Sequence, residues 1–193
     1  MSKAVMISIR PKWCEKIING DKTIEVRKTR PKLDTPFKCY IYCTNRRPFL
    51  VWGDVFRGDW FTEFTQISGY SRAEGDKIWD IFNGHIAGEF TCDRIYELAP
   101  LNHAPDDVEK QACLTREEIV NYLKGTGYGW HISAMKIYDA PCELSEFRRA
   151  CPHSWYCESC AMYLGNNGTC GNESLQIKRA PQSWCYVEVM ENV

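Results

Sequence analysis

Three charged side chains stand close together near the N-terminus of this chain, in the stretch GDKTIEVRK at residues 20–28. The alternation of apolar and polar residues predicts a half-buried strand, with Ile24 and Val26 facing the core and Thr23, Glu25 and Arg27 on the opposite face. An arginine fork can hold a phosphate or stack on a base, a carboxylate accepts hydrogen bonds from base amino groups, and Lys22 can contact a phosphate or polarise a carbonyl. These groups suit recognition of a nucleotide. The alternative is a surface ion pair, which contributes little to stability.

A basic loop follows this strand and supplies a second set of candidate contacts. Between residues 20 and 32 the sequence has five cations and two acids. Lys28, Arg30 and Lys32 on such a loop would give salt-sensitive, sequence-independent contacts to phosphates. The alternative is a solvated loop without a ligand.

The same region lacks an obvious activated nucleophile for catalysis. If the protein is an enzyme, Lys22, Thr23 and Glu25 are the candidate catalytic residues. His131 is a further candidate, because histidine can act as a general acid or base near neutral pH. A lone histidine is more often structural.

The cysteines indicate a metal site. Six of the eleven lie between residues 142 and 185, and Cys157 and Cys160 form a Cys-x-x-Cys pair. Two thiolates at this spacing can reach one zinc ion, and Cys151 and Cys170 complete a tetrahedral set. We therefore predict a structural zinc on these four cysteines, with His153 as the main substitute. The alternative is a redox-active Cys-x-x-Cys pair.

The elements that would position these residues follow from periodicity and from start and stop signals. Strands are expected at 4–11, 23–29, 37–44, 85–98, 131–139 and 183–190, and helices at 11–20 and 114–127. The second helix has Thr115 as its N-cap and Glu118 at the third helical position, which together form a capping box. Short strands, two helices and long loops predict an α+β domain, a small mixed β-barrel with helices on its outside.

Residues 45–80 break this pattern, because they are rich in glycine and aromatic residues and show no sustained period. We expect an insertion with short strands or a hairpin. Most of its aromatic side chains are expected to form a small satellite core. Trp52 or Trp60 is instead expected to line the cleft and to stack on bases.

Composition sets limits on partners. The net charge of -1 gives no overall attraction to nucleic acids or anionic membranes, so such affinity must come from a local basic patch. No apolar run approaches the roughly 18 residues that span a bilayer, and the N-terminus is too short and interrupted for a signal peptide. We expect a cytoplasmic protein with a single domain over residues 1–193, and no membrane partner.

Taken together, these segments resemble the ASCH domain family, which has a PUA-like β-barrel fold. SIRPKWCEKIINGDKTIEVRKTRP is similar to the family's first strand, helix and Gly-x-Lys-x-x-Glu-x-Arg signature, which falls on Gly20, Lys22, Glu25 and Arg27. IAGEFTCDRI resembles a barrel strand with a Gly-Glu pair, here Gly88 and Glu89, and PQSWCYVEV resembles the closing strand. The basic loop and the cysteine-rich region at about 142–180 are similar to a subgroup found often in phages and prophages.

The resemblance implies a nucleic-acid or nucleotide ligand, in most members RNA. It implies a cleft near the closing strand, which makes Ser183 a candidate for ligand contact. We therefore expect RNA or a modified nucleotide to be bound by Lys22, Glu25, Arg27, Lys28, Arg30 and Ser183.

Two other functions stay open. One branch of the family hydrolyses acetylated cytidine with a lysine, a threonine and a glutamate; Lys22 falls on that lysine, but Glu25 stands where the threonine nucleophile would be. A hydrolase, either a ribonuclease or an acetylcytidine amidohydrolase-like enzyme, is the first alternative. The second is a phage accessory protein that binds a protein partner through the aromatic insertion.

Overall fold

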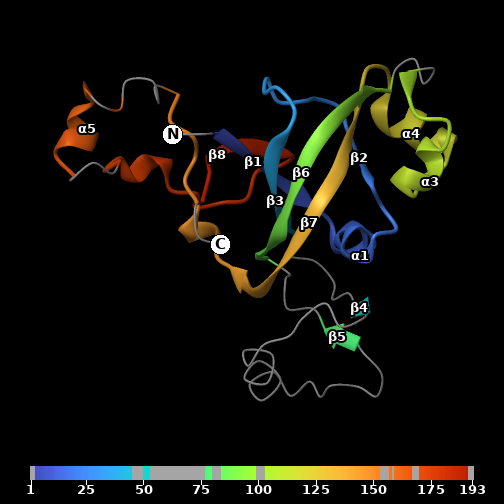
Figure 1. Cartoon of the computed structure of the whole chain (residues 1–193), viewed down its shortest axis with the longest axis horizontal. Helices are drawn as coiled ribbons and strands as arrows, with labels where there is room; N and C mark the ends of the chain where they lie inside the picture. Colours follow the sequence, from blue (N-terminus) through green and yellow to red (C-terminus); the bar gives the residue numbers. More distant parts are fainter. Residues whose placement is uncertain are drawn as a thin grey trace.

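One curled mixed sheet forms the centre of the structure (Figure 1). This computed structural model describes residues 3–44, 50–52, 77–79, 84–98, 103–152, 157, 159–166 and 170–190. The sheet order is β2-β7-β6-β3-β1-β8, and only the β1–β3 pair is parallel among these neighbours. The strands are β1 (Lys3–Ile9), β2 (Ile24–Arg27), β3 (Phe37–Cys43), β6 (Ile86–Glu97), β7 (Tyr128–Cys142) and β8 (Trp184–Glu188).

Strand β1 shows why the sheet has two covered faces. Val5, Ile7 and Ile9 belong to the main core, whereas Ala4 and Met6 belong to a second apolar cluster. Because side chains alternate along a strand, β1 is apolar on both faces and takes an interior place in the sheet. The main core includes the fully buried Trp130 and the inward face of β3.

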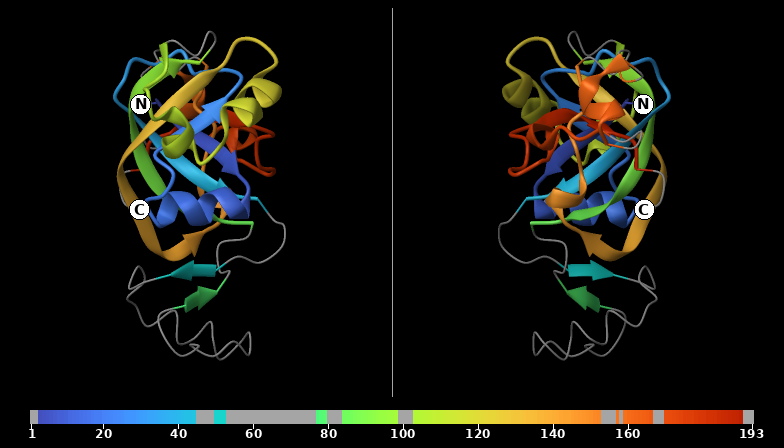
Figure 2. Two further views of the ribbon diagram at one scale, coloured as in Figure 1. Left: turned by 90° about the vertical axis from the view of Figure 1, so that its right-hand side faces the viewer. Right: turned by 90° about the vertical axis from the view of Figure 1, so that its left-hand side faces the viewer.

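Helix α1 (Pro11–Ile18) closes one end of this core (Figure 2). Its proline occupies the first turn, where a missing N–H costs nothing, and the chain then turns through Gly20 at a φ of 78°. Cys14, Ile17 and Ile18 point into the main core. Helix α1 and this turn therefore lead directly into the charged strand β2.

Two further helices, α3 (Val108–Ala112) and α4 (Arg116–Leu123), pack beside β2 (Figure 1). The capping box of Thr115 and Glu118 at the start of α4 is confirmed. Ile24 and Val26 of β2 pack with residues of these helices in a third cluster, separate from the main core. The expectation that Ile24 and Val26 face the barrel core is therefore wrong, and the opposite face of β2 carries the charged residues inward.

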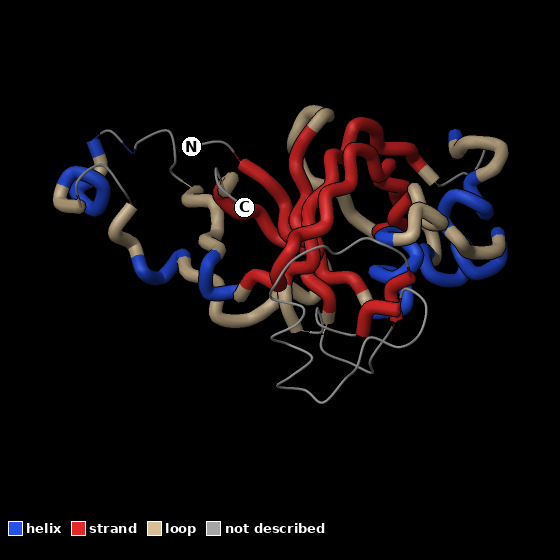
Figure 3. Tube along the Cα trace, turned by 60° about the horizontal axis from the view of Figure 1, so that its bottom comes forward, coloured by secondary structure: helices blue, strands red, loops and turns tan. Residues whose placement is uncertain are grey.

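The strands form one curled sheet, red in Figure 3, and hydrogen bonds join its two edge regions. The Trp184 indole Nε1 donates to Thr29 Oγ1 at 3.0 Å, and the backbone N–H of Lys32 donates to the Tyr186 hydroxyl at 2.7 Å. These bonds join the end of β2 and its following loop to β8. The result is the expected small α+β barrel with helices on its outside.

The remaining elements lie in the two irregular regions. In the insertion, β4 (Leu50–Trp52) pairs antiparallel with β5 (Lys77–Trp79). Most of its aromatic residues, including Trp60, lie outside the described residues. The cysteine-rich region contains the short helix α5 (Ala161–Leu164) and the 3-10 turns η2 (Leu144–Glu146) and η4 (Glu173–Leu175).

Candidate ligand-binding site

A pocket of about 430 Å³ lies where β1, α1, β2 and α4 converge. All three charged residues of the β2 motif line it. Its wall also includes Ser8, Trp13, Thr44, Glu118, Tyr122 and Gln182. These residues come from distant parts of the chain, so the pocket forms only when the barrel closes.

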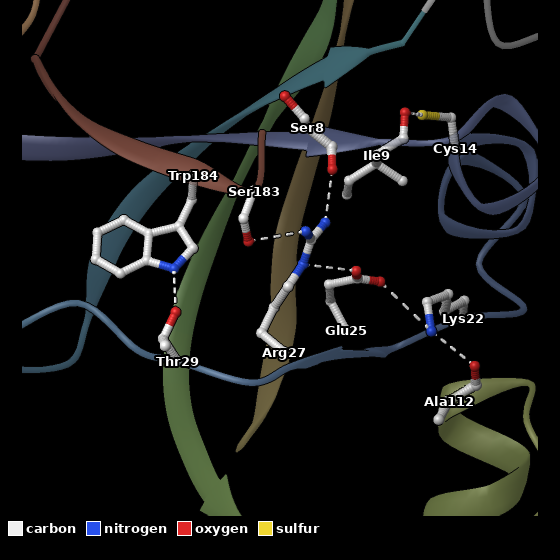
Figure 4. A network of polar contacts seen from close by, with 10 residues as sticks. All are labelled: Ser8, Ile9, Cys14, Lys22, Glu25, Arg27, Thr29, Ala112, Ser183 and Trp184. Atoms are coloured by element: carbon white, nitrogen blue, oxygen red, sulfur yellow. Dashed lines mark hydrogen bonds and ion pairs between the residues drawn. The ribbon is translucent and has the colours of Figure 1, made fainter. Parts of the chain in front are cut away.

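The charged residues of the motif form a buried array (Figure 4). Lys22, Glu25 and Arg27 are only 2%, 6% and 7% exposed. The Glu25 carboxylate lies between the two cations, with Oε2 3.5 Å from Lys22 Nζ and Oε1 3.0 Å from Arg27 Nε. The alternative of a solvated surface ion pair is therefore wrong, and one carboxylate balances one of two buried cations.

Arg27 of β2 contacts β1 and the residue that precedes β8 at the pocket wall (Figure 4). Its Nη2 donates to the Ser8 carbonyl oxygen at 2.7 Å, and its Nη1 donates to Ser183 Oγ at 3.2 Å. The contact of Nε with Glu25 has the distance of an ion pair but not the direction of a hydrogen bond, so Nε–H is a buried donor with no hydrogen-bond partner in the described part of the chain. Ser183, predicted to contact the ligand, is thus hydrogen-bonded to Arg27.

Lys22 reaches the pocket from just before β2. Its Nζ donates to the Ala112 carbonyl oxygen at 2.7 Å, at the end of α3, and lies 5.1 Å from the centre of the Trp13 ring. Burial lowers the pKa of Lys22 below its ordinary value, and the charge of Glu25 opposes that shift. A lysine in this setting exchanges its proton more readily than an exposed one.

Thr23 and His131 do not line this pocket. The Thr23 hydroxyl lies 3.4 Å from Gln111 Oε1 of α3, which places it away from Glu25 and Arg27. The Thr23 hydroxyl therefore contacts α3, outside the pocket that Lys22 and Glu25 line. His131 Nδ1 lies 2.6 Å from Asp93 Oδ1 on the neighbouring strand, in an exposed pair.

Lys28 and Arg30 line a neighbouring hollow rather than the pocket. Both are exposed. Glu89, from the Gly-Glu pair, also lies elsewhere: its carboxylate accepts from Lys38 at 2.8 Å and from the Tyr138 hydroxyl at 2.8 Å.

Three pocket residues, Trp13, Thr44 and Tyr122, carry no clear signal in the sequence. Trp13 and Tyr122 bring aromatic rings from two different helices. The Thr44 hydroxyl is buried and has no hydrogen-bond partner among the residues that the structure describes. Tyr122 is 45% exposed. An aromatic residue on the outer face of a predicted helix is the one feature of this set that the sequence pattern could have suggested.

The four cysteines predicted to bind zinc lie in the cysteine-rich region. Cys151, Cys157, Cys160 and Cys170 are all partly exposed free thiols. Desolvation raises the pKa of Cys157, and the charges of Cys151, Cys170 and Cys160 raise it further. However, no three His, Cys, Asp or Glu side chains among the described residues are grouped to hold a metal ion. His153 lies outside the described residues, and zinc binding stays a prediction.

The curled sheet with helices outside it defines a PUA-like small barrel. The fold is similar to the crystal structure of ASCH from Zymomonas mobilis, with a TM-score of 0.52 and 13% sequence identity over 96% of this chain and 87% of that one. Two variants of that protein match with the same TM-score of 0.52: a tyrosine-to-phenylalanine variant at 13% identity, covering 97% of this chain and 91% of that one, and a serine-to-alanine variant at 12% identity, covering 96% and 88%. This chain therefore has the ASCH fold.

Other comparisons add no family or activity. No family model matches the sequence, and no curated protein matches it. Within the described residues, no helix is long and apolar enough to cross a membrane.

Proposed function

We propose that this protein binds RNA or a modified nucleotide in the pocket lined by Lys22, Glu25 and Arg27. The observation that carries the proposal is the burial of two cations and one carboxylate in the wall of a 430 Å³ pocket. Burying charges is costly, and a purely structural network could be replaced by apolar residues at little or no loss of stability. A charged group with a shifted pKa that lines a cavity, as Lys22 does, is more typical of a functional site.

The pocket offers both shape and polarity for a nucleobase. Trp13 and Tyr122 bring aromatic rings to the pocket wall. Stacking on such rings is worth about 1–3 kcal/mol per base in proteins that bind single strands. Thr44 and Gln182 bring a hydroxyl and an amide to the pocket wall, and these groups can bond with the edge of a base or with ribose. Glu25 supplies an acceptor for amino groups.

Measuring the affinity of Arg27→Ala for a labelled single-stranded RNA tests this proposal. We expect at least a tenfold loss, roughly 1.4 kcal/mol, because the variant removes a charged donor from the pocket wall. Arg148→Ala is the matched control: Arg148 also donates to a backbone carbonyl, that of Asn172 at 2.6 Å, but it does not line the pocket. Wild-type affinity in a folded Arg27→Ala protein would refute the proposal.

The lowered pKa of Lys22 favours a second candidate, a hydrolase that acts on RNA or an acetylated nucleoside. A lysine with a lowered pKa gives up its proton more readily than an ordinary lysine and can serve as a base or a nucleophile. Incubation with RNA and with acetylated cytidine distinguishes the two functions. Product that disappears in Lys22→Met would support the hydrolase, and intact substrate in both reactions would refute it.

A further inference from the structure

We propose that the hollow beside the pocket is a second subsite, which holds phosphates of nucleotides adjoining the one in the pocket. The ligand is then a single strand of several nucleotides rather than a free nucleoside. This inference rests on the proposed function, because it assigns the pocket to one nucleotide of that strand.

The hollow has the charge that a phosphate backbone requires. It has a volume of about 600 Å³ and is lined by residues 28–34 together with Tyr128. Lys28, Arg30 and Lys32 bring three exposed cations to it, and Asp34 is the only acid among the described residues of its wall. None of the three cations forms an ion pair with a carboxylate in the part of the chain that the structure describes.

The backbone of the hollow is held in place before any ligand arrives. Thr29 accepts from the Trp184 indole at 3.0 Å, and the Lys32 N–H donates to Tyr186 at 2.7 Å. Pro31, between them, is buried. The loop is thus anchored to β8 while its charged side chains stay exposed, which lowers the entropic cost of binding.

One cation–aromatic contact connects the pocket with the hollow, and a second lies within the hollow. Lys28 Nζ lies 5.4 Å from the ring centre of Tyr122, which lines the pocket. The Arg30 guanidinium lies 5.7 Å from the ring centre of Tyr128, which lines the hollow. Alternating cations and rings are the arrangement by which proteins follow a single strand, with phosphates on the cations and bases on the rings.

The two compartments also differ in how their cations are engaged. In the pocket, Lys22 and Arg27 already contact Glu25 and backbone carbonyls. In the hollow, the cations face solvent. The pocket is therefore suited to an uncharged base and ribose, and the hollow to the phosphates that follow.

The test compares a hollow variant with a control of equal charge. The hollow variant is Lys28→Gln/Arg30→Gln/Lys32→Gln, and the control is Lys110→Gln/Lys178→Gln/Arg179→Gln, three exposed cations that line neither compartment. The probes are an octaribonucleotide and a ribonucleoside monophosphate, titrated between 50 and 200 mM salt. Each lost phosphate contact flattens the plot of log affinity against log salt by about 0.7, so we expect the octamer slope to fall by about 2 in the hollow variant and to stay unchanged in the control.

The outcomes separate this inference from the proposed function. An octamer slope that is unchanged in the hollow variant, while Arg27→Ala still weakens binding, overturns the second subsite and leaves the pocket intact. Equal wild-type affinity for the monophosphate and the octamer overturns it as well. Polyphosphate that competes as well as the octamer would show a general polyanion surface and would also overturn it. Absence of any RNA binding by the wild type would refute the proposed function itself.

Discussion

Replacing Glu25 with glutamine should destabilise the protein strongly, because it leaves two buried cations without their shared counter-charge. Glutamine keeps the size of the side chain, so packing changes little. Lys22 Nζ lies 3.5 Å and Arg27 Nε 3.0 Å from the carboxylate, and all three residues are less than 10% exposed. Solvent cannot replace the lost charge effectively at such a site.

The expected loss follows from this burial. Removing one partner of a buried ion pair typically costs about 3–5 kcal/mol, a large share of the roughly 5–15 kcal/mol that stabilises a native protein. For a chain of 193 residues, each kcal/mol lowers the melting temperature by about 2–4 °C, so Glu25→Gln should lower it by roughly 6–20 °C.

Chemical denaturation of Glu25→Gln beside Asp21→Asn makes the measurement decisive. Asp21 pairs with Lys16 at 4.0 Å, but their side chains are 61% and 36% exposed, so we expect the control to lose less than about 1 kcal/mol. Adding Lys22→Met to Glu25→Gln should recover part of the loss, because it removes one unpaired cation. A loss in Glu25→Gln no larger than that of the control would refute the view that the array is desolvated.

Three further results are expected. Burial lowers the pKa of Lys22 in the folded protein, so between that lowered pKa and 10.5 the unfolded chain binds more protons than the folded one. The free energy of unfolding of the wild type, relative to that of Lys22→Met, should therefore increase with pH across that window. A constant difference would contradict the burial of a charged Lys22. Metal analysis of the purified protein should give about one zinc per chain, and either no zinc or an oxidised Cys157–Cys160 pair would contradict the predicted staple. Gly88→Ala should cost about 1–3 kcal/mol in a denaturant titration, because a Cβ there would lie 2.3 Å from the Lys136 carbonyl oxygen, and an unchanged midpoint would contradict that contact.

Local signals in the sequence were sufficient for most of the elements. The capping box of Thr115 and Glu118 depends on residues three positions apart, so the start of α4 could be predicted without knowledge of the fold. The alternation in β2 likewise places Glu25 and Arg27 on one face. What the alternation could not reveal is which face looks into the barrel, because all four residues of β2 are buried.

The missing information is long-range. Ile24 and Val26 are covered by helices that follow more than eighty residues later in the chain. The periodicity within β2 gives no information about these helices. The same limit applies to Thr44 and Tyr122, which become pocket residues only when the barrel closes. Short-range charge, in contrast, did identify Lys28 and Arg30 as exposed cations, although not the hollow that they share.

A structure of the protein with a bound single-stranded oligoribonucleotide would test directly whether the pocket holds a nucleotide. We expect one nucleotide in the pocket, in contact with Trp13 or Tyr122 and with Arg27. A strand bound with that pocket empty, on any other surface of the protein, would contradict it.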